Sequence, residues 1–202
     1  MKKINYFVTE AHSLTNLGIR QFFINFKEFE CAGFASTKEE TFSKLESLKG
    51  NLQLLILDLN LGNESGLDVL KEVKKIIPGL KVLVYSMFTN PGIVSLALEY
   101  GADGFVCKDG SEDELIKAAR EIINGKLFIH QNLAASLYTY SNLLQSLTKQ
   151  EQTIFKKIIE RKNNFQISEE LNLSIRSVEN YMSRIYSKLG CRGHEEIISH
   201  FG

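Results

Sequence analysis

Between residues 4 and 125, short apolar runs alternate with longer segments in which apolar residues recur at helical spacing. The runs that read as β-strands are residues 4–8, 29–35, 52–57, 81–86 and 104–107. Strands that alternate with helices favour βαβ units, in which parallel strands form one sheet with helices on both faces. We therefore expect an α/β domain with a doubly wound, five-stranded parallel sheet.

Short sequence signals mark several helix ends in this first part of the chain. Thr37 and Ser111 are each followed three residues later by a glutamate, which is the spacing of a capping box. Pro91 suits the first turn of a helix, where a backbone N–H has no helical partner. Gly101 and Gly125 are expected to end helices, because glycine readily adopts the left-handed conformation of a C-terminal cap.

From residue 147 onward, the pattern is helical and no strand signal remains. Thr148 and Glu151 have capping-box spacing and open a first helix. A helix over residues 164–171 is followed by a tight turn and by a second helix, with Ser174 as its N-cap and Leu189 near its end. These features predict a helix–turn–helix unit.

Three parts follow from these patterns: an α/β domain at residues 1–125, a linker with some helix at 126–146, and a small all-α domain at 147–202. Residues 1–130 carry 15 Lys and Arg against 17 Asp and Glu, whereas residues 147–202 carry 9 against 7. The all-α domain is only mildly basic. A prediction that it binds nucleic acid therefore depends on residue pattern rather than on bulk charge.

Composition excludes several classes of protein. No stretch approaches the roughly 18 apolar residues of a membrane-spanning helix, and no signal-peptide pattern is present. We therefore expect a cytoplasmic protein that has no membrane partner. The three cysteines are an odd number without metal-ligand spacing, so we interpret them as packing residues.

Polar side chains lie at the ends of four of the predicted strands. Asp58 and Ser86 end the third and fourth strands, Lys108 follows the fifth and Glu10 follows the first. The carboxyl ends of parallel strands meet at one edge of the sheet, which is where open α/β sheets bind ligands. A nucleophilic carboxylate, a hydroxyl and a cation are what an aspartyl phosphate requires, together with a divalent metal ion. The sequence therefore predicts a phosphoryl site at this edge.

The first domain resembles the receiver domain of two-component response regulators of the NarL/FixJ family, which has a flavodoxin-like fold. The segments that carry the resemblance are residues 57–61 with Gly66, Ser86, and residues 102–109. The resemblance implies that Asp58 is the phospho-acceptor and that the carbonyl of Asn60 binds the metal ion. It further implies that Ser86 is the switch hydroxyl, Lys108 the cation that pairs with phosphate and Phe105 an aromatic rotamer switch.

One departure from this family concerns the metal site. Glu10 and Ala11 stand where the family has two adjacent acids that hold Mg²⁺. Alanine offers no oxygen to an ion that demands near-octahedral oxygen ligands, so the expected ligands Glu10, Asp58 and Asn60 should bind Mg²⁺ only weakly. Two versions of the site remain open: a working phospho-acceptor, and a receiver that responds poorly or not at all to phosphate.

The all-α domain resembles the LuxR-type helix–turn–helix. The matching segments are residues 147–151, 167–171, 174–181 and 188–190. Apolar residues at helical spacing are expected to pack the two helices together, which leaves the other face of the second helix free to enter a major groove. The residues expected to contact bases or phosphates are Arg176, Glu179, Asn180, Ser183, Arg184, Lys188 and Arg192.

Two residues depart from the pattern of this second family. Glu179 stands where its members usually present lysine or another non-acidic residue, and it either accepts a hydrogen bond from cytosine or is neutralised by Arg176. Arg161 replaces the glycine that usually ends the first helix. We therefore expect Asn163 or Asn164 to supply the left-handed residue of that turn.

The leading hypothesis is a transcriptional response regulator whose receiver domain controls homodimer formation and binding to double-stranded DNA. Phosphorylation of Asp58 by a sensor histidine kinase would be the signal. The alternatives are a phosphorylation-independent regulator, and a protein-interaction adaptor or phosphate sink with weak DNA binding, which Glu179 and the small positive charge suggest. We expect no enzyme, because a phosphohydrolase of this kind uses an Asp-x-Asp pair and Asn60 occupies the second position.

Overall fold

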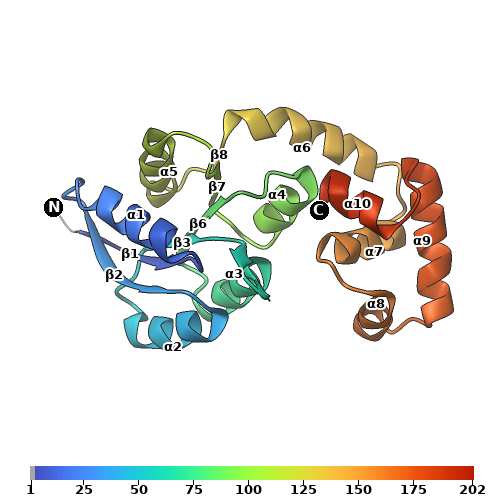
Figure 1. Ribbon diagram of the computed structural model, residues 1–202, viewed down its shortest axis with the longest axis horizontal. Coiled ribbons are helices and arrows are strands. Elements are labelled where there is room, and N and C mark those ends of the chain that lie inside the picture. Colours follow the sequence, from blue (N-terminus) through green and yellow to red (C-terminus); the bar gives the residue numbers. More distant parts are fainter. Residues whose placement is uncertain (1–2) are drawn as a thin grey trace. The chain divides into compact units, whose positions relative to one another are not determined.

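The computed structural model describes residues 3–202, which divide into two compact units. The first unit contains the residues up to Phe88 together with Ala97–His130, and the second contains Thr89–Leu96 and Gln131–Gly202. Figure 1 shows that strands occur in the first unit and that the second is helical, as the sequence predicts. Within the described part of the chain, no helix is long and apolar enough to cross a membrane.

A parallel sheet of six strands forms the centre of the first unit, in the order β2-β1-β3-β6-β7-β8. The strands are β1 Ile4–Thr9, β2 Phe29–Ala35, β3 Leu54–Leu57, β6 Lys81–Ser86, β7 Gly104–Cys107 and β8 Phe128–Ile129. The doubly wound parallel fold is confirmed, but the predicted number of five strands is wrong. Strand β8 pairs with β7 over two residues only, which is too short for an apolar pattern to reveal it.

Helices of the first unit pack on both faces of the sheet (Figure 1). They are α1 Ser13–Phe23, α2 Lys38–Leu48, α3 Gly66–Ile76 and α5 Glu112–Ile123. Helix α4 Pro91–Glu99 lies between β6 and β7 in the sequence, and most of it belongs to the second unit. Tyr6, Leu54 and Ile56 share one face of the sheet and pack in one core with residues of α1 and α5. Successive residues of a strand point to opposite faces. Helices α2 and α3 bury their own apolar residues on the other face.

Helices α2, α4 and α5 all begin at the predicted starts, but one of the predicted capping boxes does not form. The side chain of Thr37 caps α2 by accepting the backbone N–H of Glu40, and α4 begins at Pro91. The predicted capping box at Ser111 is wrong, since this side chain makes no capping bond to α5. The carboxylate of Glu114, which the box requires, pairs instead with Nε2 of His130 at 2.9 Å.

From Gln131 onward, the second unit consists of a long helix followed by the predicted helix–turn–helix. Its helices are α6 Gln131–Leu144, α7 Lys149–Ile159, α8 Asn164–Leu171, α9 Ile175–Leu189 and α10 His194–Phe201. The rings of Tyr140, Phe155 and Phe201 pack against one another with centroids 5.6–6.1 Å apart. Ile167 and Val178 are buried between α8 and α9. The apolar spacing therefore packs the two helices together as expected.

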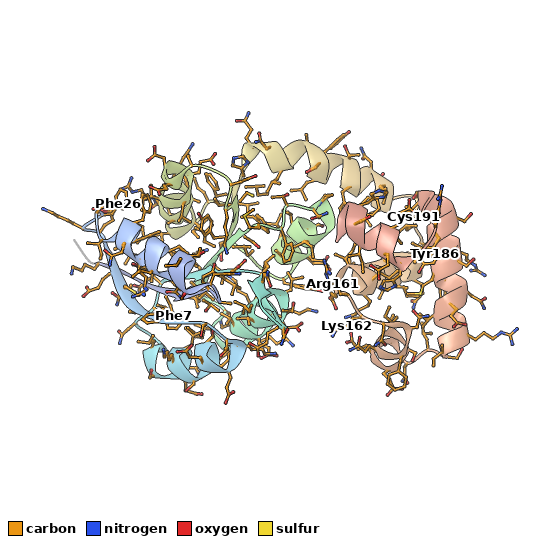
Figure 2. The ribbon with its side chains drawn as sticks, in the orientation of Figure 1. Phe7, Phe26, Arg161, Lys162, Tyr186 and Cys191 are labelled. Atoms are coloured by element: carbon orange, nitrogen blue, oxygen red, sulfur yellow. The ribbon has the colours of Figure 1, made fainter. Side chains whose placement is uncertain are left out.

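The turn between α7 and α8 differs from the prediction. Arg161 itself adopts the left-handed conformation, with φ of 61°, and neither Asn163 nor Asn164 does. Asn163 is extended because it caps α8: its side chain accepts the N–H of Gln166, whose side chain in turn accepts the N–H of Asn163, both at 2.9 Å. Figure 2 labels Arg161 beside Lys162 in this turn.

Candidate functional sites

Backbone register brings the residues of the predicted phosphoryl site to one edge of the sheet. Strands β1 and β3 pair up to their last residues, and the N–H of Asp58 donates to the carbonyl of Thr9 at 2.9 Å. Glu10 therefore follows β1 at the level where Asp58 follows β3. On the neighbouring strands, the N–H of Lys108 donates to the carbonyl of Ser86 at 3.0 Å. Four strand ends thus meet, as the sequence predicts.

Lys108 lies between two buried carboxylates. Its Nζ is 2.5 Å from Oε2 of Glu10 and 2.6 Å from Oδ2 of Asp58. The side chains of Glu10, Asp58 and Lys108 are 1%, 3% and 10% exposed. Buried charges persist only where they are paired and hydrogen-bonded. The three groups carry a net charge of about −1 when ionised, and this excess favours a cationic ligand.

The second oxygen of Asp58 has no partner. Its Oδ1 is buried and accepts no hydrogen bond from any group in the described residues. A buried polar atom without a partner is rare in folded proteins and points to a missing ligand or to a reactive role. Asp58 also lines a surface pocket, so ligand can reach it from solvent. The pocket is lined by His12, Thr15, Asp58, Asn60, Tyr85, Ser86, Met87, Phe88 and Lys108.

Ser86 and Asn60 of the predicted phosphoryl site line this pocket, and Phe105 lies on β7, next to β6. Ser86 is fully buried at the end of β6, and its Oγ lies 3.4 Å from the N–H of Phe88. Phe105 is fully buried and pairs with Val84 in register, so it occupies the same sheet face as Ser86. Asn60 is exposed at the start of hairpin strand β4 Asn60–Leu61, which pairs with β5 Glu64–Ser65.

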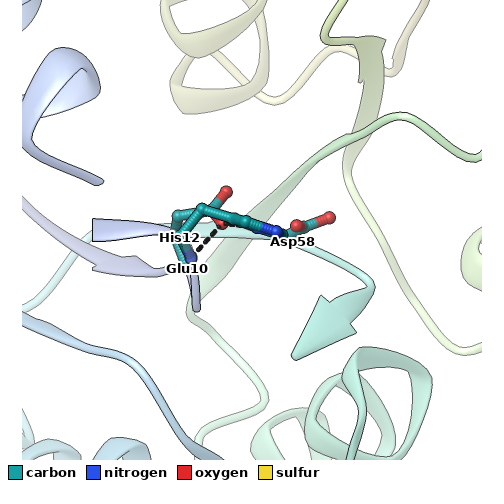
Figure 3. A group of neighbouring side chains, drawn as sticks. All are labelled: Glu10, His12 and Asp58. Carbon is teal, nitrogen blue, oxygen red and sulfur yellow. Dashed lines mark hydrogen bonds and ion pairs between the residues drawn. The ribbon is translucent and has the colours of Figure 1, made fainter. Parts of the chain in front are cut away.

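The donors at this pocket do not match an all-oxygen magnesium site. Glu10 and Asp58 supply carboxylates, but Ala11 supplies no donor. Among the His, Cys, Asp and Glu side chains of residues 3–202, the one that joins the two acids is His12, which the sequence analysis did not single out (Figure 3). Its Nδ1 lies 3.0 Å from Oε1 of Glu10. Mg²⁺ prefers oxygen ligands in near-octahedral geometry, so this set fits it poorly.

The loop after Asp58 depends on close approach of α3. A Cβ added at Gly66 would lie 2.2 Å from the carbonyl oxygen of Asp58 and 2.5 Å from Cα of Leu59. We expect Gly66→Ala to lower the free energy of unfolding of the first unit by about 2 kcal/mol, because backbone has to move. Urea unfolding measures the change. Gly18→Ala in α1 is the control: nothing lies within 4 Å of its added Cβ, so a loss of equal size there would contradict the argument.

The polar face of α9 is open to solvent. Each of the seven residues predicted to contact DNA is exposed, and Val178, Met182 and Ile185 on the opposite face are buried. Because each helical residue advances by about 100°, Arg176 and Asn180 lie near the middle of the exposed face. Glu179 lies at its edge and lines a groove with Phe165 and other residues of α8 and α10.

One of the predicted DNA-contacting cations has a structural partner. Lys188 Nζ lies 2.6 Å from Oε2 of Glu151 and 3.3 Å from the carbonyl of Ser146. Glu151 is buried, and its carboxylate also accepts the N–H of Thr148 in the capping box of α7. Lys188 thereby ties the C-terminal part of α9 to the start of α7. The capping-box spacing predicted the bond to Thr148, but no short-range signal reveals a partner 37 residues away.

This buried ion pair predicts a pH dependence of stability. The hydrogen bond from Lys188, followed by that from the Thr148 backbone, holds the pKa of Glu151 below its usual value. A lowered folded-state pKa adds stability above the unfolded-state pKa, and this stability is lost as pH falls through the folded-state value. We expect Glu151→Gln to destabilise the second unit by about 1–3 kcal/mol at pH 7 and much less near pH 3. Thermal unfolding of both proteins across pH measures this. A difference that does not shrink in acid would contradict it.

Comparison with protein families identifies both units. The family described as "Response regulator receiver domain" matches residues 7–120, which is more than half of the chain. The family described as "Bacterial regulatory proteins, luxR family" matches residues 145–201. The chain belongs to the LuxR-type response regulators. It combines a receiver domain with a LuxR-type DNA-binding domain, as the resemblance in the sequence implied.

Similar proteins cover this response regulator along nearly its whole length. The transcriptional regulatory protein DesR of Bacillus subtilis is 27% identical over 97% of this chain and 95% of its own. The transcriptional activator protein ExaE of Pseudomonas putida is 28% identical over 95% and 92%. RcsB from Salmonella enterica serovar Typhimurium, in a structure bound to promoter P1flhDC with BeF₃⁻, has the same fold. The similarity extends over 98% of this chain and 98% of the RcsB chain, at 23% sequence identity and a TM-score of 0.73.

Proposed function

We propose that Asp58 is the phospho-acceptor of this response regulator and that its modification controls dimer formation and DNA binding. The observation that carries the proposal is the pairing of a buried aspartate with Lys108 while its second oxygen has no partner. In phosphoryl transfer, a carboxylate oxygen of Asp58 attacks phosphorus and the donor's leaving group departs. Ser86 and Lys108, at neighbouring strand ends, are the groups placed to bind the new phosphoryl oxygens.

The experiment uses acetyl phosphate and measures the intact mass of the full chain. Incubations contain either Mg²⁺ or Mn²⁺, so that a poor fit to one metal ion does not hide the reaction. We expect a gain of one phosphoryl group in the native protein and none in Asp58→Asn. Size-exclusion chromatography of the same samples reports dimer formation. An unchanged mass with both metal ions would refute Asp58 as the acceptor.

A second candidate function is regulation without phosphorylation, and Ala11 and Lys108 favour it. Ala11 removes a donor that the family uses for its metal ion, and Lys108 already pairs with Asp58 before any phosphoryl group is present. DNA binding that is equal in native protein and Asp58→Asn, whether or not acetyl phosphate is present, would establish this alternative.

We further propose that the exposed face of α9 reads the major groove of a two-fold site as a homodimer. Arg176, Asn180 and Ser183 would meet base edges, and Arg184 and Arg192 would contact phosphates. The same proposal includes a sensor histidine kinase as phosphodonor and a cytoplasmic location. It also includes the absence of catalytic turnover, and domain limits at residues 125 and 147. An adaptor that lacks useful DNA affinity is the competing reading, and Glu179 is the residue that suggests it.

A further inference from the structure

The receiver pocket offers three metal donors of an unusual combination. One atom each of Glu10, His12 and Asp58 lie within 4.8 Å of one another (Figure 3). Two of these are carboxylate oxygens and the third is an imidazole nitrogen. The buried Oδ1 of Asp58 has no other partner among the residues that the structure describes. The side chain of His12 is 64% exposed, so an ion can reach the group from solvent.

Two of the three donors are spaced as neighbouring ligands of one small dication. Oε1 of Glu10 and Nδ1 of His12 are 3.0 Å apart. Two ligands at right angles, each about 2.1 Å from one metal ion, are separated by about 3.0 Å. Lys108 occupies the opposite oxygens, Oε2 of Glu10 and Oδ2 of Asp58. Oε1 of Glu10 also accepts the backbone N–H of His12 at 2.8 Å, and a carboxylate oxygen has a second lone pair for a metal ion. An ion held by Glu10 Oε1, Asp58 Oδ1 and His12 therefore does not have to displace the lysine.

We propose that this pocket binds a first-row transition-metal dication, of the class of Mn²⁺ and Co²⁺, in preference to Mg²⁺. Imidazole nitrogen suits such ions, whereas Mg²⁺ is held by oxygen, and here an alanine stands where the family supplies the second acid. Water completes the coordination through the open side of the pocket. The inference deepens the proposed function, on which it rests for its biological role, because the ion would lie beside the phospho-acceptor.

Titration of the metal-free full chain with Co²⁺ tests the proposal without any phosphodonor. Visible absorption reports nitrogen and oxygen ligands of Co²⁺, and calorimetry gives the affinity for Mg²⁺. We expect Co²⁺ to bind at least about tenfold more tightly than Mg²⁺, and His12→Gln to weaken Co²⁺ binding at least about tenfold with little effect on Mg²⁺. His200→Gln, which removes an exposed histidine of α10, is the matched control and should leave both affinities unchanged.

A second variant tests the cause of the preference. Ala11→Asp restores the acid that the family places there, and we expect it to tighten Mg²⁺ binding and to reduce the preference for Co²⁺. Equal or tighter binding of Mg²⁺ by the native chain, or Co²⁺ binding that ignores His12→Gln, would overturn the inference. If Asp58 still gains a phosphoryl group in that case, the proposed function survives. If Co²⁺ binds as expected but no phosphoryl group is gained with Mg²⁺, Mn²⁺ or Co²⁺, only the proposed function fails.

Discussion

Lys108→Met is expected to destabilise the receiver domain by about 3 kcal/mol at neutral pH. Glu10 and Asp58 are almost fully buried, and Lys108 is the cation that contacts both of them. Methionine fills similar space but leaves two carboxylates in a poorly solvated site without a counter-charge. Breaking a buried ion pair from one side is far more costly than losing an exposed one, because the remaining charges stay desolvated.

The measurement is urea unfolding followed by hydrogen exchange in peptides from β3, which separates the receiver transition from that of the DNA-binding domain. Lys44→Met is the matched control, since Lys44 pairs with Glu40 where both side chains are substantially exposed. We expect it to cost less than about 1 kcal/mol. Asp58→Asn in the Lys108→Met background should restore most of the loss, because one buried charge is then removed. Equal stability of Lys108→Met and native protein would show that the pocket is solvated more than its burial indicates.

Much of this site was predictable because it depends on strand ends. A buried strand is visible in sequence as an apolar run, and parallel topology then places its last residue at a known edge of the sheet. This is why Asp58, Ser86, Lys108 and Glu10 are found together, although 98 residues separate Glu10 from Lys108. The strand pattern predicts which residues lie at the carboxyl edge of the sheet, and this was sufficient to find these four residues.

Features that depend on side-chain geometry or on long-range partners were not predictable. The sequence places His12 two residues after Glu10, yet only coordinates show that its ring turns back onto that carboxylate. Likewise, the sequence predicts that Lys188 contacts phosphate, and only the structure shows its bond to the buried Glu151. The prediction of the left-handed residue in the turn at Arg161 failed for a local reason. Asn163 has to be extended to cap α8, so Arg161 adopts the left-handed conformation.

The second large expected effect is on DNA affinity, and it concerns Glu179 on α9. It tests whether this domain binds DNA through the predicted face of that helix. Glu179 is exposed and lies at the edge of that face, and no ion pair joins it to Arg176 within residues 3–202. Neutralisation by Arg176, one of the two readings that the sequence left open, is therefore not supported by the structure. From the edge of the helix, a side chain is nearer to the phosphate backbone than to base edges. An acid there repels DNA whatever its sequence.

Glu179→Lys should accordingly raise the affinity of the full chain for duplex DNA of any sequence, by roughly tenfold at low salt. The dependence of log K on log salt concentration should steepen by about one, as expected for one added phosphate contact. Fluorescence anisotropy with random-sequence duplexes at several salt concentrations measures both. Glu39→Lys is the control, because it makes the same change of charge at an exposed position of α2 in the receiver domain. If the two variants gain equally, the effect is bulk charge and α9 does not face DNA. If Glu179→Lys gains and the native chain already binds at physiological salt, the adaptor reading fails, because the acid then tunes a working DNA-binding surface rather than abolishing it.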